Sequence, residues 1–160
     1  MTMKKVFHFD SPREHYECDA AIVSCFDDRF QLAFAKFLKR RGIFRTDYIK
    51  IAGGAKILAS AADSASGREF VLEQIRISMR LHATKRVVLM VHSDCGAYDG
   101  LAGGFGGDAR AEAEHHEGQL RRAAENLQAA IKGVELQAYF VDFEGIWAVT
   151  LPAGQKVIAS

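Results

Sequence analysis

Short, almost uninterrupted apolar runs alternate along the chain with longer stretches in which apolar residues recur at helical spacing. A continuous apolar run of this length is typical of a strand covered on both faces, as in a parallel sheet. The most uniform of these runs is RVVLMVH, residues 86–92. The pattern predicts strands at residues 19–25, 46–52, 86–92 and 134–143, and a short antiparallel return strand at 146–151.

The stretches between the predicted strands are expected to be helices. The first, residues 28–42, begins with acidic residues and ends with three basic residues and a glycine, and we expect Asp28 to cap its start. A second is predicted at residues 68–83, and a third, long and polar, from about Ala109 to Lys132 with Asp108 as its N-cap, after a glycine-rich loop at 100–108. The apolar positions expected to face inward on the first two helices are Phe30, Leu32, Phe34, Phe37, Leu38, Phe70, Val71, Ile75 and Met79, with Ile77 as a further candidate.

Alternation of strands with helices predicts the α/β class. We expect a mostly parallel sheet of four strands, closed by the short antiparallel return strand, with helices on both faces. A chain of 160 residues, 49% of them hydrophobic, is long enough for one core. The expected organisation is therefore a single domain over residues 1–160, in which residues 1–18 form an N-terminal arm.

Charge and cysteine content exclude several classes of function. The formal net charge is only +1, so neither nucleic acid nor an anionic membrane is an expected partner. No apolar run approaches the roughly 20 residues of a membrane span, and no signal-peptide core follows the basic start. Three cysteines, an odd number, do not suggest a disulfide framework, and a cytoplasmic location is expected.

Side chains of the kind that bind metals stand at the ends of two predicted strands. Cys25 ends the first strand, His92 ends the third, and Cys95 follows three residues later on a turn. In a parallel sheet of this kind, ligands bind at the carboxyl ends of the strands. A set of two cysteines and one histidine suits zinc, and three protein ligands leave a fourth position open, as in catalytic zinc sites. The sequence therefore predicts a zinc site if the first and third strands are neighbours.

Asp27 and Arg29 follow Cys25 closely and are the candidate catalytic residues. Asp27 could reach the metal or a water molecule on it, and Arg29 could hold the Asp27 carboxylate through paired hydrogen bonds. The alternative is an ordinary solvated turn with charges at a helix start. The proximity of the predicted metal ligands favours the catalytic interpretation.

These motifs resemble those of the β-class carbonic anhydrases. The resemblance rests on Cys-x-Asp-x-Arg at 25–29 and His-x-x-Cys-Gly at 92–96, together with IAGG at 51–54, and it extends in element order over roughly residues 19 to 145. It implies the sheet order 2-1-3-4, which places the first and third strands side by side. It also implies zinc held by Cys25, His92 and Cys95, and an Asp27–Arg29 pair in which Asp27 either leaves the fourth position to water or occupies it in a closed state.

The activity implied by this resemblance is the reversible hydration of carbon dioxide to bicarbonate by hydroxide held on zinc. Ile51, Ala52, Gly53 and Gly96 are the expected substrate-pocket residues, with Gly96 allowing close backbone approach. A homo-oligomer, a dimer in particular, is also implied. Two alternatives remain open: a zinc hydrolase of carbon disulfide or carbonyl sulfide, and a zinc-binding relative without catalytic activity.

The chain departs from the family pattern in several places. The arm before the first strand is short, and Lys50 and Ile51 stand where family members commonly carry Arg-Asn. No clear counterpart exists for the upstream glutamine that often helps to hold the substrate. Among the other reactive residues, His115 and His116 are expected on a solvated helix face, His82 at a helix end and Cys18 without a role, while Tyr98 and Asp99 are candidates for the pocket wall.

Overall fold

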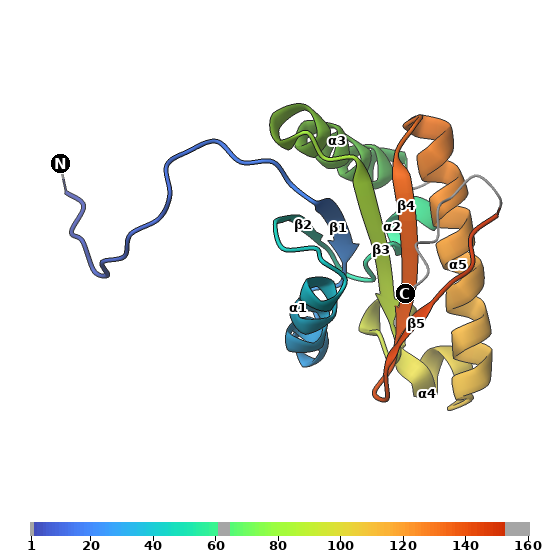
Figure 1. Cartoon of the computed structure of the whole chain (residues 1–160). Coiled ribbons are helices and arrows are strands. Elements are labelled where there is room, and N and C mark those ends of the chain that lie inside the picture. Colours follow the sequence, from blue (N-terminus) through green and yellow to red (C-terminus); the bar gives the residue numbers. More distant parts are fainter. Residues whose placement is uncertain (1, 61–64, 153–160) are drawn as a thin grey trace.

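A five-stranded sheet forms the centre of the molecule (Figure 1). The structure is a computed structural model that describes residues 2–60 and 65–152. The strand order is β2-β1-β3-β4-β5; the first four strands are parallel, and β5 is antiparallel to β4. This confirms the predicted class and strand order. The strands are β1 (Ala20–Ser24), β2 (Thr46–Lys50), β3 (Arg86–His92), β4 (Glu135–Val141) and β5 (Ile146–Ala148).

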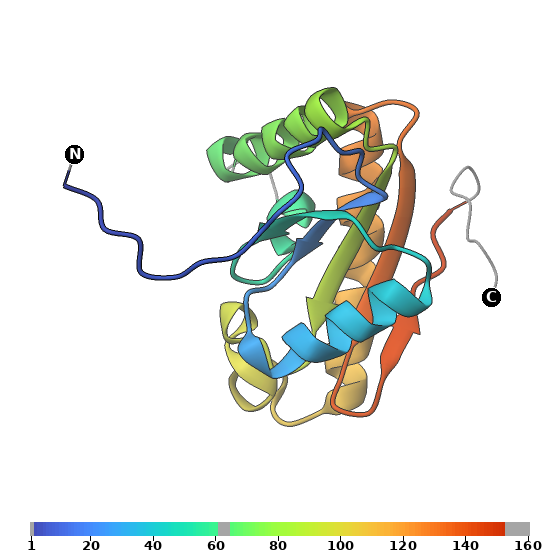
Figure 2. The same ribbon diagram turned by 60° about the vertical axis from the view of Figure 1, so that its left-hand side comes forward.

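Helices cover both faces of the sheet, as predicted (Figures 1 and 2). α1 packs on one face, where its buried residues Phe34 and Leu38 meet Ile22 and Met90. The second face carries α2, α3 and α5, whose apolar side chains form the larger core cluster with alternate residues of β1, β3 and β4. The α-helices of the described residues are α1 (Gln31–Arg40), α2 (Lys56–Ala59), α3 (Ala65–His82), α4 (Gly100–Phe105) and α5 (Ala109–Ala130). The same residues include the 3-10 turns η1 (Asp28–Phe30) and η3 (Gly96–Tyr98).

Several details of the helices differ from the sequence-based expectations. Leu32 and Phe70 are exposed, not inward-facing, because the buried positions on their helices fall at Phe34 and Leu38 and at Val71, Leu72 and Ile75. The glycine-rich segment 100–108 is not simply a loop, since it contains α4. Asp108 does cap α5, and its carboxylate accepts hydrogen bonds from two backbone amides.

The expected capping role of Asp28 is wrong. The side chain that caps this turn belongs to Asp27, whose Oδ1 accepts a hydrogen bond from the backbone amide of Arg29 at 3.0 Å. η1 intervenes before α1, so the helix itself begins at Gln31 without a side-chain cap. Asp27 therefore has two structural tasks at once, capping this turn and facing the end of the sheet.

The chain before β1 runs as an extended segment that projects from the body of the molecule (Figure 1). It meets the body of the molecule at the end of α3, where the backbone amide of Cys18 donates to the carbonyl of His82 at 2.9 Å. The expected domain, residues 1–160, includes positions 1, 61–64 and 153–160, which lie outside the described residues. Among the described helices, none combines the length and the apolar character that crossing a membrane requires.

Candidate metal centre

Three side chains of metal-binding type converge at the carboxyl ends of β1 and β3. The Sγ atoms of Cys25 and Cys95 are 4.0 Å apart, and these atoms and a ring nitrogen of His92 all lie within 4.8 Å of one another. All three residues are buried. Cys25 follows β1 directly, His92 is the last residue of β3, and Cys95 precedes η3, so the pairing of β1 with β3 brings the two sequence motifs to one point.

The His92 ring is oriented by a hydrogen bond to the backbone of the next residue. Nδ1 lies 2.8 Å from the carbonyl oxygen of Ser93, and because a carbonyl can only accept, the proton is on Nδ1. Nε2 is then a free acceptor, and it is buried without a hydrogen-bond partner. Burial also lowers the pKa of His92, which favours the neutral ring. A buried, unpaired Nε2 beside two thiols is the arrangement expected of a metal-ligating histidine.

Apart from His92, the two thiols pack against mainly apolar side chains. Cys25 and Cys95 pack against Tyr98, Ala97 and Phe105. Burial raises the pKa of Cys95 to about 11, with the neighbouring Cys25 contributing in the same direction. A divalent cation between the sulfurs would supply the missing positive charge and displace the thiol protons.

Asp27 and Arg29 form the pair that the sequence predicts, and Arg29 has a second carboxylate partner. Nη2 and Nε of Arg29 donate to Oδ2 of Asp27 at 2.7 and 3.1 Å. Nη1 donates to Oδ2 of Asp94, and Nη2 also reaches the carbonyl of Asp94, each at 3.0 Å. The hydrogen bonds from Arg29 lower the pKa of Asp27, which keeps this carboxylate ionised. Oδ2 of Asp27 lies 3.8 Å from Nε2 of His92, so an anion faces the convergence point.

Comparison with known proteins agrees with this geometry. A family model described as "Putative carbonic anhydrase" matches residues 15–151, most of the chain. The chain belongs to this carbonic anhydrase family. A search of curated proteins found no match.

The carbonic anhydrase fold is also found by structural comparison. β-Carbonic anhydrase isoform I of Trichomonas vaginalis superimposes with a TM-score of 0.59 at 13% identity, over 90% of this chain and 88% of that one. The carbonic anhydrase of Streptococcus mutans gives 0.56 at 20% identity, over 85% and 84%. These similarities confirm the predicted resemblance to the β class in fold.

This member of the family holds the 93–95 turn of the candidate metal centre with a buried carboxylate that the sequence did not single out. Glu112, on α5, is only 1% exposed. Oε1 accepts the backbone amide of Asp94 at 2.6 Å, and Oε2 accepts the hydroxyl of Ser93. Ser93 and Asp94 lie between His92 and Cys95, so Glu112 fixes the segment that carries two of the candidate ligands. Asp94 itself has a positive φ of 54°, a conformation that needs such external support.

Close backbone approach to the site occurs at Gly54, not at Gly96 as expected. A Cβ on Gly54 would lie 2.3 Å from the Met90 carbonyl oxygen and 2.9 Å from the Cys25 amide nitrogen, whereas a Cβ on Gly96 would meet nothing within 4 Å. Gly54 also has a φ of +55°. The turn that starts at Ile51 therefore crosses directly over the ends of β1 and β3.

The four expected pocket residues have different surroundings. Ile51 is half-buried and packs against the larger core cluster. Ala52 and Gly96 are exposed, and Gly53 is buried close to Ala97. The role of these four positions in binding a substrate stays a prediction.

His116 is not on a solvated helix face, which corrects the expectation for this residue. It is fully buried on α5, and neither ring nitrogen has a hydrogen-bond partner. Its ring meets the edge of Tyr98, with ring centroids 4.5 Å apart, behind the two thiols. Burial lowers the pKa of His116 to about 4. His115, by contrast, is exposed as predicted.

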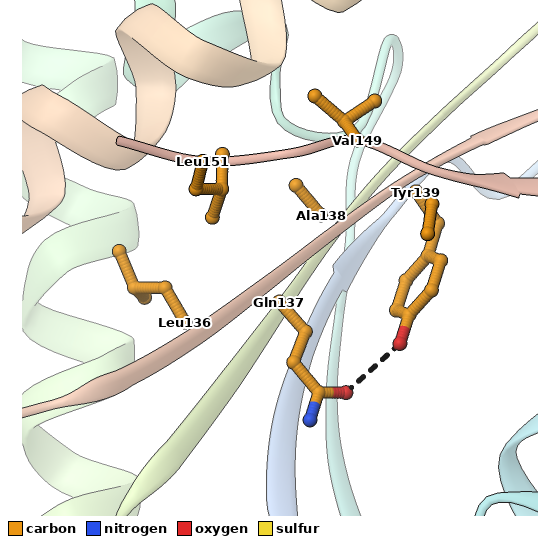
Figure 3. A pocket seen from close by; sticks show the side chains of 7 residues that line it. Leu136, Gln137, Ala138, Tyr139, Val149 and Leu151 are labelled. Carbon is orange, nitrogen blue, oxygen red and sulfur yellow. Dashed lines mark hydrogen bonds between the residues drawn. The ribbon is translucent and has the colours of Figure 1, made fainter. Parts of the chain in front are cut away.

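A small pocket lies away from this site, at the edge of the sheet. It is lined by residues of β4, β5 and the segment after β5, including Leu136, Gln137 and Val149 (Figure 3). Tyr139 donates a hydrogen bond to Gln137 at its edge. With a volume of about 20 Å³ it has room for about one water molecule, so it is a packing defect of the sheet edge and not a substrate pocket.

Proposed function

We propose that this protein binds zinc through Cys25, His92 and Cys95 and catalyses the reversible hydration of carbon dioxide to bicarbonate. The observation that carries the proposal is the buried, unpaired Nε2 of His92 beside two buried thiols. Leaving such an acceptor without a partner costs about 1–3 kcal/mol, which a metal ion at this position would recover. Family membership and the β-carbonic anhydrase fold support the same assignment.

Zinc at this position would make hydroxide available near neutral pH by lowering the pKa of a water molecule to about 7. Asp27 would orient that water by accepting one of its hydrogen bonds. Arg29 keeps the Asp27 carboxylate ionised and donates to both of its oxygens, which holds Oδ2 at 3.8 Å from Nε2 of His92. Asp94 in turn fixes Arg29.

The pairing of Asp27 with Arg29 favours a working enzyme over the non-catalytic alternative. A carboxylate acting as fourth ligand would have to leave its short hydrogen bonds with Arg29. The zinc hydrolases of carbon disulfide or carbonyl sulfide remain a second candidate class, because the half-buried Ile51 replaces a polar residue common in the family. We also retain the expectations of one domain, a cytoplasmic location and a homodimer, with no nucleic acid or membrane partner.

The test compares substrates on tag-free protein loaded with zinc. Stopped-flow measurements should show carbon dioxide hydration above the buffer rate from about pH 7 to about pH 9, a range that spans ionisation of the zinc water. Asp27→Asn should keep zinc and lose rate by about 100-fold, as expected for loss of a positioned proton acceptor. A gain in rate would instead assign Asp27 to the fourth coordination position. Turnover of carbon disulfide or carbonyl sulfide alone would favour the hydrolase, and no turnover of any of the three would favour the non-catalytic protein.

A further inference from the structure

A second cluster of metal-binding side chains lies at the opposite end of the sheet. Cys18, Asp47 and His82 each offer a ligand atom, and these atoms all lie within 4.8 Å of one another. Cys18 precedes β1, Asp47 is near the start of β2, and His82 is the last residue of α3. Figure 2 shows the chain before β1 passing beside the end of α3, where the Cys18 amide bonds to the His82 carbonyl.

We propose that Cys18, Asp47 and His82 form a second binding site for a divalent metal ion of the zinc class. Sulfur, imidazole nitrogen and carboxylate oxygen are the three donor types that zinc accepts in proteins. They come here from three separate elements, so the convergence is a product of the fold and not of local sequence. The site stands on its own residues and shares none with the candidate metal centre.

The surroundings of Asp47 resemble the supporting contacts of a metal ligand. The hydroxyl of Ser78 donates to Oδ2 of Asp47 at 2.6 Å, and Ser78 is itself 2.7 Å from the hydroxyl of Thr84. Both Ser78 and Thr84 are buried. Such hydrogen bonds orient a ligating carboxylate and are a regular part of metal sites.

The N-terminal arm covers the cluster with Tyr16 and offers His15 as a candidate fourth ligand. The ring of Tyr16 stacks on the ring of His82, with centroids 4.2 Å apart, and its hydroxyl lies 3.5 Å from Oδ1 of Asp47. The ring of His15 is 5.9 Å from that of His82. A metal ion here would therefore fasten residues 15–18 to β2 and α3.

Metal binding would replace a hydrogen bond that the cluster now contains. Nδ1 of His82 and Oδ2 of Asp47 are 2.7 Å apart, which is closer than the roughly 3.3 Å between two such ligands on tetrahedral zinc. The two groups need to separate by about 0.6 Å as the ion takes the place of the shared proton. The competing explanation is a plain histidine–aspartate pair beside an inert thiol, and it gives Cys18 no part in binding.

The experiment isolates this cluster by removing the thiols of the candidate metal centre. The chain has three cysteines, so Cys25→Ser/Cys95→Ser protein retains only Cys18. Titration of that double variant with Co²⁺ should produce a thiolate-to-cobalt charge-transfer band that saturates near one equivalent. Adding Cys18→Ser should abolish the band, and His82→Gln should weaken binding at least tenfold. No band in the folded double variant would overturn the proposal.

A second measurement covers the case in which the double variant does not fold. Native mass spectrometry of zinc-loaded, tag-free wild-type protein should show one more zinc ion per chain than the Cys18→Ser variant. Equal zinc content in the two proteins would overturn the proposal. Because neither comparison reads activity, failure of this second site is distinguishable from failure of the proposed function.

Discussion

Nη1 of Arg29 donates a hydrogen bond to Oδ2 of Asp94 at 3.0 Å, across the ends of two neighbouring strands. The same guanidinium holds the carboxylate of Asp27. A single side chain thus couples the motif after β1 to the turn after β3 that carries Cys95. The position of Asp27 relative to His92 depends on this bridge as well as on the strands themselves.

Weakening the bridge should reduce the rate of carbon dioxide hydration without removing zinc. Asn suits the positive φ of residue 94, so Asp94→Asn removes the charge and leaves the backbone unstrained. Loss of one charge-assisted hydrogen bond of about 1.5 kcal/mol corresponds to a fall in rate of about tenfold. Stopped-flow kinetics together with metal analysis measure both quantities. Asp28→Asn, at an exposed position nearby, is the control and should keep the wild-type rate; a wild-type rate in Asp94→Asn would contradict the bridging role.

Glu112 should matter for the stability of the fold, unlike an exposed acidic residue on the same helix. Glu112→Gln leaves Ser93 and the Asp94 amide with a weaker partner in a buried place, so the free energy of unfolding should fall by about 1–3 kcal/mol. Glu114→Gln is the matched control, because Glu114 forms only an exposed ion pair with Arg110 and should change stability by less than about 0.5 kcal/mol. Urea denaturation compares the two variants. Equal midpoints would mean that Glu112 does not support the metal-site turn.

Gly54 should tolerate no side chain. In Gly54→Ala the new methyl group would meet the Met90 carbonyl oxygen at 2.3 Å, and the backbone would be strained at a positive φ. We expect a loss of more than about 2 kcal/mol in the free energy of unfolding. Gly118→Ala, in the middle of α5 with open space around it, should instead gain about 0.5–1 kcal/mol. Thermal denaturation of the two variants should shift in opposite directions; a shift in the same direction would contradict the packing described for the 51–55 turn.

The buried His116 should make the fold sensitive to acid. Burial lowers its pKa to about 4 in the folded protein, helped by repulsion from His115, His92 and Lys56, against about 6.5 when unfolded. Glu112, 3.8 Å away, would favour the protonated ring but is engaged by Ser93 and Asp94. As the pH falls, the unfolded chain therefore binds the proton first. The contribution of the neutral His116 ring to stability is complete above about pH 6.5. It is lost as the pH falls towards about 4, by up to about 3 kcal/mol.

Unfolding free energies measured at several pH values test this in pairs of variants. His116→Leu should show a shallower decline between about pH 6.5 and about pH 4, because the group that takes up the proton is gone. His8→Gln, at an exposed position of the arm that is not among the groups acting on His116, should decline like the wild type. Identical slopes in His116→Leu and the wild type would show that other groups cause the acid sensitivity.

The sheet could be predicted from the sequence because buried parallel strands leave a clear local pattern. The run 86–92 matches β3 residue for residue, and the strand-end positions of Cys25 and His92 followed from the same runs. Bringing these residues to one point required only the adjacency of β1 and β3. That part of the candidate site depends on topology, which the resemblance to the β class supplied.

The support of the site could not be predicted, because it comes from contacts distant in sequence. In the sequence, Glu112 and His116 look like ordinary surface residues of a polar helix. Only the packing of α5 against the sheet buries them. The partner of Arg29 at Asp94 lies 65 positions away. Gly54 and Gly96 look alike in sequence, and the difference between them is the distance to the Met90 carbonyl. Cys18 and His82, expected to be without chemistry, join Asp47 only in the folded chain.

The most direct test of the central claim is the number of sulfur atoms bound to zinc. In Cys18→Ser protein loaded with one equivalent of zinc, Cys25 and Cys95 are the only thiols left. X-ray absorption at the zinc edge should then show two sulfur neighbours at about 2.3 Å, with nitrogen or oxygen neighbours at about 2.0 Å that include one imidazole. Zinc with one sulfur neighbour or none in this folded protein would contradict the account.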